Sequence, residues 1–332
     1  MNITAETVKQ LATEVGFDLC GITSPDTIPE VRTQYYNWLA RKFHGEMSYL
    51  ENEPERRTEP RRLMDGIGSI IMLGLNYYQP DSETAPPGHG RVSRYARGRD
   101  YHKIIVGKTK KLIRRMRELT PAGESNEYKW YVDFGPVLER AYAEKAGLGF
   151  IGKNSMLISR AFGSWLFLSE VVTTLRLEPD DPRAINHGRC GSCTLCIDAC
   201  PTGAIVEDRV VDATRCISYL TIERPTEIAE DLARGMGNRI FGCDVCQDVC
   251  PHNHRAVVTG EKELLPSHGV GEFLEARRVL EMRTREEFLD LAAGTSLVRT
   301  RLEGLQRNAR IVLRNEAMGI ADTTAPDDEN SK

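Results

Sequence analysis

The chain has 332 residues, of which 40% are hydrophobic and 28% are charged, and its formal net charge is −4. This is a normal globular composition, and the length suggests two or three domains. No apolar run approaches the ~18 residues that a membrane-spanning helix needs, and the first residues form a helical pattern rather than a basic segment followed by an apolar one. We therefore expect a cytoplasmic protein in which clustered cysteines stay reduced and favour metal over disulfides.

Helices and strands are expected to alternate up to about residue 178. The first helix begins after Thr4 and ends at Gly16. A strand at 17–22 follows, in which Cys20 is interpreted as a small buried apolar residue. The later predicted elements are a helix near 31–43, a strand at 69–75, a loop at 79–91, a helix at 104–119, a helix at 136–147 that starts with Pro136, a strand at 165–175, and helices at 284–293 and 301–317. A polar, proline-containing segment at 177–189 indicates a domain boundary.

Two cysteine groups carry the strongest chemical signal. The first has the spacing C-x2-C-x2-C-x3-C-P and consists of Cys190, Cys193, Cys196 and Cys200, followed by Pro201. The second has the spacing C-x2-C-x3-C-P and consists of Cys243, Cys246 and Cys250, followed by Pro251. This is the pattern of bacterial two-cluster ferredoxins, in which the last cysteine of a run binds the other cluster.

Crossed pairing of this kind predicts two complete [4Fe-4S] ligand sets. The first set is Cys190, Cys193, Cys196 and Cys250, and the second is Cys200, Cys216, Cys243 and Cys246, which leaves only Cys20. The alternative is structural zinc. Two four-thiolate zinc sites would need only separated C-x2-C pairs, and neither the third cysteine of the run nor the Cys-Pro pairs.

A glycine-rich stretch at 147–152, GLGFIG, fits the dinucleotide-binding pattern and nearly fits a phosphate loop. Both motifs need a preceding strand, whereas a helix is predicted here, and Asn154 replaces the Ser or Thr that would hold magnesium. Two interpretations remain. The turn and the residues after it could donate hydrogen bonds to a large polar ligand, or they could simply end a helix.

Eight stretches closely resemble the epoxyqueuosine reductase family, and together they cover about residues 1–315. They are HGEMSYLENEPERRTEPRRL, LGLNYY, RYARGRDYHK, YVDFGPVLERAYAEKAGLGFIGKNSMLI, GSWLFLSEVVTTL, CGSCTLCIDACPTGAI, RCISYLTIE and FGCDVCQDVCP. The resemblance implies a cobalamin-dependent iron–sulfur enzyme that reduces the epoxide of epoxyqueuosine at the tRNA wobble position to queuosine, the last step of queuosine biosynthesis.

The implied fold class is α+β, with a nitroreductase-like α/β corrinoid-binding domain, a two-[4Fe-4S] bacterial ferredoxin-like domain and C-terminal helices. The expected boundaries are 1–180 for the cobalamin-binding catalytic domain, 181–260 for the ferredoxin-like domain, 261–318 for the helical region and 319–332 for a disordered tail. Some family members carry a further helical-repeat domain, and this sequence is expected to be too short for a full one. The motif D-x-H-x2-G would supply an axial histidine. Asp100 and His102 begin it, but Ile105 stands where its glycine would be, which is compatible with the base-off cobalamin without a histidine ligand that the resemblance implies.

The resemblance also implies site residues. Asp133, in YVDFGP, is the expected proton donor, and we expect burial against corrin and substrate to raise its pKa although a helix N-terminus nearby favours the ionised form. Its alternative role is that of a helix cap. The expected cobalamin contacts are Arg57, Lys153, Asn154, Ser155, Met156, Cys243 and Asp244. For Arg57 a plain surface position is the alternative, and Tyr95 and Tyr101 either line the pocket or serve only in packing.

The expected partners are the anticodon stem-loop of queuosine-type tRNAs and an unidentified low-potential electron donor, with the protein a monomer that binds no membrane. Basic runs at 91–117 and 299–314 are candidate phosphate-binding patches, although a solvated helix face is the plainer interpretation. The wobble base would have to leave the anticodon stack. The nucleic-acid contacts that we expect are Arg97, Arg99, Tyr219 and Glu223.

Two rival functions share part of this pattern. A corrinoid reductive dehalogenase would use the same cofactors, but such enzymes are usually exported with a twin-arginine leader, which the sequence does not show at its start. A plain ferredoxin-like electron carrier would need neither Asp133 nor the corrin-side loop. A corrinoid absorption band after reconstitution with cobalamin would separate the carrier from the two enzymes.

Overall fold

The computed structural model describes residues 3–81, 84–121, 125–184 and 187–320. Its main sheet has the strand order β1-β2-β7-β4, and every neighbouring pair is antiparallel. The strands are β1 (Leu19–Thr23), β2 (Ser69–Asn76), β4 (Tyr128–Tyr131) and β7 (Leu166–Thr173). Every residue of β2 is buried, because both faces of the sheet are covered by helices. The predicted strands at 17–22, 69–75 and 165–175 are confirmed within two residues at each end.

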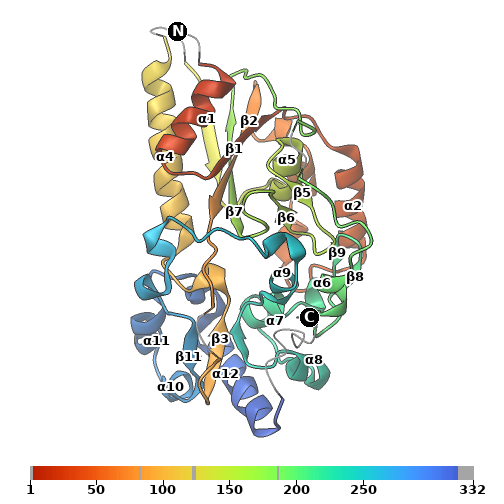
Figure 1. Ribbon diagram of the computed structural model, residues 1–332, viewed down its shortest axis with the longest axis vertical. Coiled ribbons are helices and arrows are strands. Elements are labelled where there is room, and N and C mark those ends of the chain that lie inside the picture. The colour runs from red at the N-terminus through yellow and green to blue at the C-terminus, as the bar shows by residue number, and fades with distance from the viewer. Residues whose placement is uncertain (1–2, 82–83, 122–124, 185–186, 321–332) are drawn as a thin grey trace, which may run out of the picture.

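The two faces of the sheet carry different cores. Ile71 and Leu73 point to one side and pack with α1 (Ala5–Glu14) and α4 (Tyr101–Leu119), whereas Ile70 and Met72 point to the other side and pack with α5 (Glu139–Lys145). This alternation follows from the two-residue period of a strand. Figure 1 shows α1 and α4 on one side of β1 and β2, with α5 on the opposite side.

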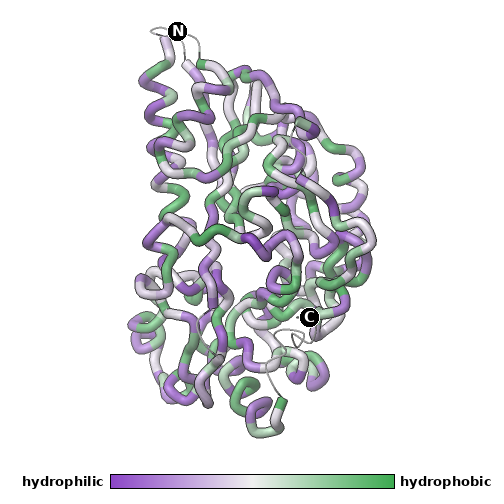
Figure 2. Tube along the Cα trace, viewed as in Figure 1, coloured by the Kyte–Doolittle hydropathy of each residue, from purple (hydrophilic) through white to green (hydrophobic). Residues whose placement is uncertain are grey.

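The start of α4 matters for the site. The side chain of Asp100 accepts a hydrogen bond from the backbone N–H of His102 at 3.1 Å and caps the helix. The helix therefore begins at Tyr101, three residues before the predicted start at Ile104. Hydrophilic and hydrophobic residues alternate along α4 in Figure 2, and its buried positions include Ile105 and Leu112.

A second sheet was not predicted. It has the order β10-β3-β11 and consists of β3 (His89–Val92), β10 (Arg239–Phe241) and β11 (Phe273–Glu275). One strand comes from each of the three predicted domains, so the chain segments interlock here. Its core partners are the helices α10 (Ala276–Glu281), α11 (Arg285–Ala292) and α12 (Arg301–Ala317). The predicted helices at 284–293 and 301–317 are thus confirmed.

The cysteine region repeats one local structure. The one-turn helices α6 (Leu195–Asp198) and α9 (Val245–Asp248) each begin two residues after a cysteine and end two residues before a Cys-Pro pair. In Figure 1 both lie between the main sheet and the C-terminal helices. The other elements of this region are β8 (Ile205–Glu207), β9 (Val210–Val211), α7 (Ile217–Ile222) and α8 (Glu230–Gly235).

The remaining elements complete the N-terminal half. They are α2 (Pro29–Ala40), α3 (Pro54–Thr58), β5 (Phe150–Ile151) and β6 (Leu157–Ile158). The predicted helix at 136–147 is shorter than expected, because the backbone after Pro136 stays irregular until Glu139. The predicted disordered tail lies almost entirely outside the described residues. Within those residues, no helix combines the length and the apolar character needed to cross a bilayer.

Candidate active site and cluster region

Asp133 lies in the irregular loop between β4 and α5, and its backbone has a left-handed φ of 62°. Its backbone N–H donates to Glu139 Oε1 at 2.8 Å, which ties the loop to the first residue of α5. The side chain of Asp133 is 59% exposed, and that of the next residue, Phe134, is among the most exposed large hydrophobic side chains. The loop therefore presents an acid and an aromatic ring to solvent.

Two neighbouring residues of α4 contact this acid. The hydroxyl of Tyr101 donates to Asp133 Oδ2 at 2.6 Å, and Nε2 of His102 lies 3.6 Å from the same oxygen. His102 Nδ1 donates to Asp100 Oδ1 at 2.7 Å, because a carboxylate can only accept. The imidazole is stacked between Tyr101 and Phe134, with ring centroids 4.0 and 4.6 Å away. Asp133 is thus held by a phenol and an oriented imidazole.

Neighbouring groups set the protonation states of Asp133 and His102. Desolvation raises the pKa of Asp133, but the imidazole of His102, 3.6 Å away, and the hydrogen bond from Tyr101 outweigh it, and the pKa lies below its usual value. Desolvation lowers the pKa of His102, but Asp100 and Asp133 raise it more, to about 9. The pKa of Asp133 is therefore lowered in the ligand-free protein, and its expected rise on burial against corrin and substrate stays a prediction. At neutral pH the proton resides on His102.

Asp133 is recessed although it is accessible. Its side chain is open to solvent, yet desolvation by the surrounding protein is the largest influence on its pKa. Arg140 shows the same combination, because it is exposed and desolvation is the main cause of its lowered pKa. Arg140 also donates to the backbone oxygen of Ser155. Such groups line a recessed surface that a ligand can reach.

Arg57 supports the same loop. Its guanidinium donates to Gly135 O at 3.1 Å and to Tyr49 O at 3.3 Å. Its buried Nε has no hydrogen-bond partner among the residues that the structure describes. Arg57 is therefore not a plain surface arginine. It retains one donor that suits a phosphate or carbonyl oxygen.

Arg299 and Glu223 form an ion pair near Asp133. Nε and one terminal nitrogen of Arg299 donate to the two oxygens of Glu223 at 2.8 and 2.9 Å. The guanidinium also lies 5.8 Å from the ring centroid of the exposed Tyr49, and its charge lowers the pKa of Asp133. The structure thus brings the predicted contact Glu223 to the site, and it adds Tyr49 and Arg299.

Two of the predicted nucleic-acid contacts are corrected. Tyr219 is buried, and its hydroxyl accepts a hydrogen bond from the backbone N–H of Glu46 at 2.8 Å. Arg97 is fully buried and pairs with Asp81 at 2.7 Å. Neither side chain is accessible to tRNA. Arg99 is exposed, with a guanidinium nitrogen 3.3 Å from Glu263.

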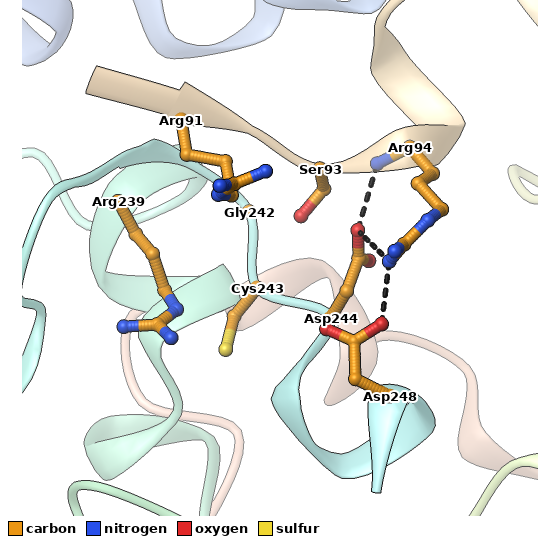
Figure 3. A pocket seen from close by; sticks show the side chains of 8 residues that line it. All are labelled: Arg91, Ser93, Arg94, Arg239, Gly242, Cys243, Asp244 and Asp248. Carbon is orange, nitrogen blue, oxygen red and sulfur yellow. Dashed lines mark hydrogen bonds and ion pairs between the residues drawn. The ribbon is translucent and has the colours of Figure 1, made fainter. Parts of the chain in front are cut away.

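The expected basic patch at 91–117 is likewise partly internal. Arg94 donates to Asp248 Oδ1 and Asp81 Oδ2, both at 2.6 Å, and its backbone N–H donates to Asp244 Oδ2 at 2.8 Å. Counting basic residues missed this network because its acids lie far away in sequence. Figure 3 shows the small pocket beside it, whose lining residues are Arg91, Ser93, Arg94, Arg239, Gly242, Cys243, Asp244 and Asp248.

The predicted cysteines gather in two groups. Burial raises the pKa of Cys196 to about 11, together with the neighbouring thiols of Cys190, Cys250 and Cys193. Burial is also the main cause that raises the pKa of Cys246. The next causes are the thiols of Cys243, Cys216, Cys200 and Cys196. These neighbours coincide with the predicted ligand sets, and Cys196 links the two. Within the described residues, no three His, Cys, Asp or Glu side chains meet as ligands of a single metal ion.

The loop after the glycine-rich stretch lies against both cysteine groups. The backbone N–H of Lys153 donates to Cys190 Sγ at 3.4 Å, and the amide of Asn154 donates to Cys246 O at 3.1 Å. The backbone N–H of Met156 in turn donates to Asn154 Oδ1 at 3.2 Å. Through Ser155 and Arg140 the loop also reaches the Asp133 side. Helix α5 precedes the glycines, as predicted, and the hairpin β5–β6 follows them, whereas both nucleotide motifs need a strand before the glycines and a helix after them.

Sequence and structure comparisons agree with one another. The family described as 4Fe-4S double cluster binding domain matches residues 189–253, and the family described as epoxyqueuosine reductase QueG matches residues 57–134. The chain is 42% identical to an epoxyqueuosine reductase from Leadbetterella byssophila, over 92% of this chain and 97% of the relative. It is 39% identical to that of Escherichia coli, over 95% and 82% of the two chains.

Solved structures of epoxyqueuosine reductases are also similar to this chain. A crystal structure of epoxyqueuosine reductase with an epoxyqueuosine-modified tRNA-Tyr stem loop has a TM-score of 0.85 and 30% identity, with 93% of this chain and 80% of that chain covered. The enzyme from Streptococcus thermophilus has a TM-score of 0.84 and 29% identity, with 95% and 82% covered. The predicted α+β class is confirmed.

Proposed function

The chain belongs to the epoxyqueuosine reductase family, and on that premise we propose that it reduces the epoxide of epoxyqueuosine at the wobble position of tRNA to queuosine. This is the last step of queuosine biosynthesis. The observation that carries the proposal is the arrangement around Asp133. An accessible acid, held by Tyr101 and His102, faces a recessed surface that is connected to the cysteine groups through Arg140 and the 153–156 loop.

Two electrons and two protons convert the epoxide into an alkene and water. The chain has a double [4Fe-4S] cluster-binding domain at 189–253, and two such clusters can supply the electrons one at a time. We assign the first cluster to Cys190, Cys193, Cys196 and Cys250, and the second to Cys200, Cys216, Cys243 and Cys246. The mutual effects of these thiols on their pKa values support the two sets.

The residues on the recessed surface fit cobalamin, which supplies the reductive cleavage of the carbon–oxygen bond when bound. Among the described residues, Nε of Arg57 has no hydrogen-bond partner. This donor suits an amide carbonyl or phosphate oxygen of the corrinoid. We also assign cobalamin contacts to the corrin-side loop and to the first residues of the second cysteine group, namely Lys153, Asn154, Ser155, Met156, Cys243 and Asp244. Asn154 and Asp244 already make protein hydrogen bonds, so both also shape the site.

Asp133 is the proton donor in this proposal, and His102 supplies its proton. Asp133 is ionised in the free protein, whereas the neighbouring imidazole is cationic at neutral pH. A bound substrate removes water from the carboxylate and favours its neutral form. One of the two protons then passes from His102 Nε2 to Asp133 Oδ2 and from there to the epoxide oxygen, and the second comes from solvent. Asp100 keeps the imidazole in the required orientation.

The groups around Asp133 suit a nucleobase that has left the anticodon stack. The exposed rings of Phe134 and Tyr49 offer stacking surfaces, and Arg299 with Glu223 offers charged hydrogen-bonding groups beside them. Arg99 offers a further cation for the RNA backbone. We further propose that the enzyme acts as a cytoplasmic monomer and receives its electrons from a low-potential donor.

The test is an anaerobic assay with purified protein, cobalamin, a chemical reductant and tRNA that contains epoxyqueuosine. Nucleoside mass spectrometry should show conversion to queuosine that depends on cobalamin and on the reductant. A protein loaded with iron and corrinoid that leaves epoxyqueuosine unchanged would contradict the proposed function.

A further inference from the structure

Two glutamates lie in contact behind the Asp133 loop. Glu170 lies within β7, opposite Tyr131 of β4, and it is fully buried. Neither of its carboxyl oxygens receives a hydrogen bond from a protein donor in the described part of the chain. Its side chain is within hydrogen-bonding contact of the side chain of Glu139, at the start of α5.

Two adjoining carboxyl groups in such a place do not both ionise at neutral pH, because Glu170 is fully buried and the two charges repel. A proton shared between them provides the hydrogen bond that the oxygens of Glu170 otherwise lack. Burial and, after it, the charge of Glu139 raise the pKa of Glu170 well above its usual value. Burial and, after it, the charge of Asp133 raise the pKa of Glu139 to about 7. The pair as a whole therefore retains a proton at neutral pH.

The charged and titratable groups that act on the pair come from every neighbouring element. Asp133 lies on the loop, Arg140 on α5, Tyr131 on β4 and Tyr101 on α4. Arg140 favours the ionised form of Glu139, whereas Asp133 opposes it. Neither influence removes the need for a proton between the two carboxyl groups.

The pair is connected to Asp133 through the backbone. Glu139 Oε1 accepts the N–H of Asp133 at 2.8 Å, at a residue whose φ of 62° is unfavourable for a side chain with a Cβ. The loop also rests on the pair directly, because a Cβ on Gly135 would meet Glu170 Oε1 at 2.9 Å and Tyr131 Cβ at 2.4 Å. Movement of either carboxyl group would therefore displace the loop.

We propose that Glu139 and Glu170 form a proton-sharing pair that positions Asp133 for the reaction. This inference rests on the proposed role of Asp133 and adds two positioning residues to it. While the proton is present, Glu170 holds Glu139 in place, and Glu139 holds the left-handed backbone of Asp133. When the proton is lost, the two carboxylates repel each other and the loop is released.

Two substitutions of Glu170 distinguish this role from simple packing. Glu170→Gln keeps the shape and supplies a permanent N–H donor to Glu139, whereas Glu170→Leu removes the donor altogether. In single-turnover assays, Glu170→Gln should retain activity on the alkaline side of neutrality, where the wild type declines. Glu170→Leu should slow the reaction about 10- to 100-fold at neutral pH, because the acid is displaced from its position.

A second readout is independent of the reaction. Hydrogen exchange of the Asp133 amide, compared at one pH, should be about tenfold faster in Glu170→Leu than in the wild type and unchanged in Glu170→Gln. An infrared band of a protonated buried carboxyl group should be present in the wild type and absent from Glu170→Gln. If the function proposed above fails, these two signals remain measurable.

The outcomes that would overturn the inference are specific. One is a Glu170→Gln enzyme whose activity declines at the same pH as that of the wild type. Another is the absence of a protonated carboxyl band from the wild type at neutral pH. If Glu170→Leu does not fold, the comparison of Glu170→Gln with the wild type decides the question alone.

Discussion

The hydroxyl of Tyr101 lies 2.6 Å from Asp133 Oδ2, and the two residues are 32 positions apart in the chain. One begins α4 and the other lies in the loop after β4, so the contact joins a helix that covers the main sheet to the end of one of its strands. Tyr101 also stacks on Phe167 of β7, with ring centroids 4.1 Å apart. The phenol is therefore fixed by packing, and it fixes the acid in turn.

Removal of this phenol should impair the acid without unfolding the site. Tyr101→Phe keeps the stacked ring and loses only the donor. A hydrogen bond to a charged group contributes about 1.5–3 kcal/mol, so the single-turnover rate should fall about 10- to 100-fold. Tyr95→Phe is the matched control, because its ring lies 6.2 Å from that of Tyr101. Equal rates for the two variants would contradict the role of Tyr101.

His102 should make folding stability depend on pH. Its folded-state pKa of about 9 lies above the unfolded value of 6.5, so its contribution is fully present below pH 6.5 and is lost as the pH rises through 9. Over that pH window the free energy of unfolding should decrease less in His102→Gln than in the wild type, with a difference of at most about 3 kcal/mol. Anaerobic urea unfolding at several pH values measures this. An unchanged slope in the variant would show that the imidazole is not cationic in the native protein.

Substitution of a single ligand cysteine should lower the iron content by the iron of one cluster. The fully loaded wild type should contain about eight irons per chain. Cys216→Ser should retain about four, because it removes a ligand of the second cluster only. Cys20→Ser is the control, since Cys20 lies in β1, opposite Leu73, and outside both cysteine groups. Bound zinc, or equal iron loss in both variants, would refute the assignment.

Arg299 should contribute to tRNA affinity through its charge. Arg299→Ala should weaken binding of the stem-loop and reduce the slope of log affinity against log salt concentration by about one. Arg183→Ala serves as the control, because Arg183 is exposed and its guanidinium pairs with the nearby Asp181. Fluorescence anisotropy across a salt series gives both slopes. Identical slopes for the two variants would place Arg299 outside the RNA interface.

The sequence indicated the cofactor-bearing parts of the fold well, because cysteine spacing and the strong apolar run of β2 are local features. It could not indicate the second sheet, since β3 is a four-residue strand with two polar residues that pairs with segments far along the chain. Such pairing depends on tertiary contacts rather than on local pattern.

The site shows the same division. Asp133 and Glu223 were named through the family resemblance, but the burial of Arg97 and Tyr219 depends on partners outside their own segments, such as Asp81 and Glu46. His102 was considered only as a cobalt ligand and rejected as one. The residue that it contacts, Asp133, lies in a loop whose left-handed backbone cannot be predicted from the local sequence. The lowered pKa of Asp133 in the ligand-free protein could not be predicted for that reason.

The most direct test of the account compares the wild type with Asp133→Asn, both loaded with iron and cobalamin. Asparagine tolerates the left-handed backbone and cannot donate the acidic proton. Single-turnover conversion of epoxyqueuosine in tRNA should fall about 10²- to 10⁴-fold, with cluster and corrinoid spectra unchanged. A variant that converts epoxyqueuosine at the wild-type rate would contradict the central role of Asp133.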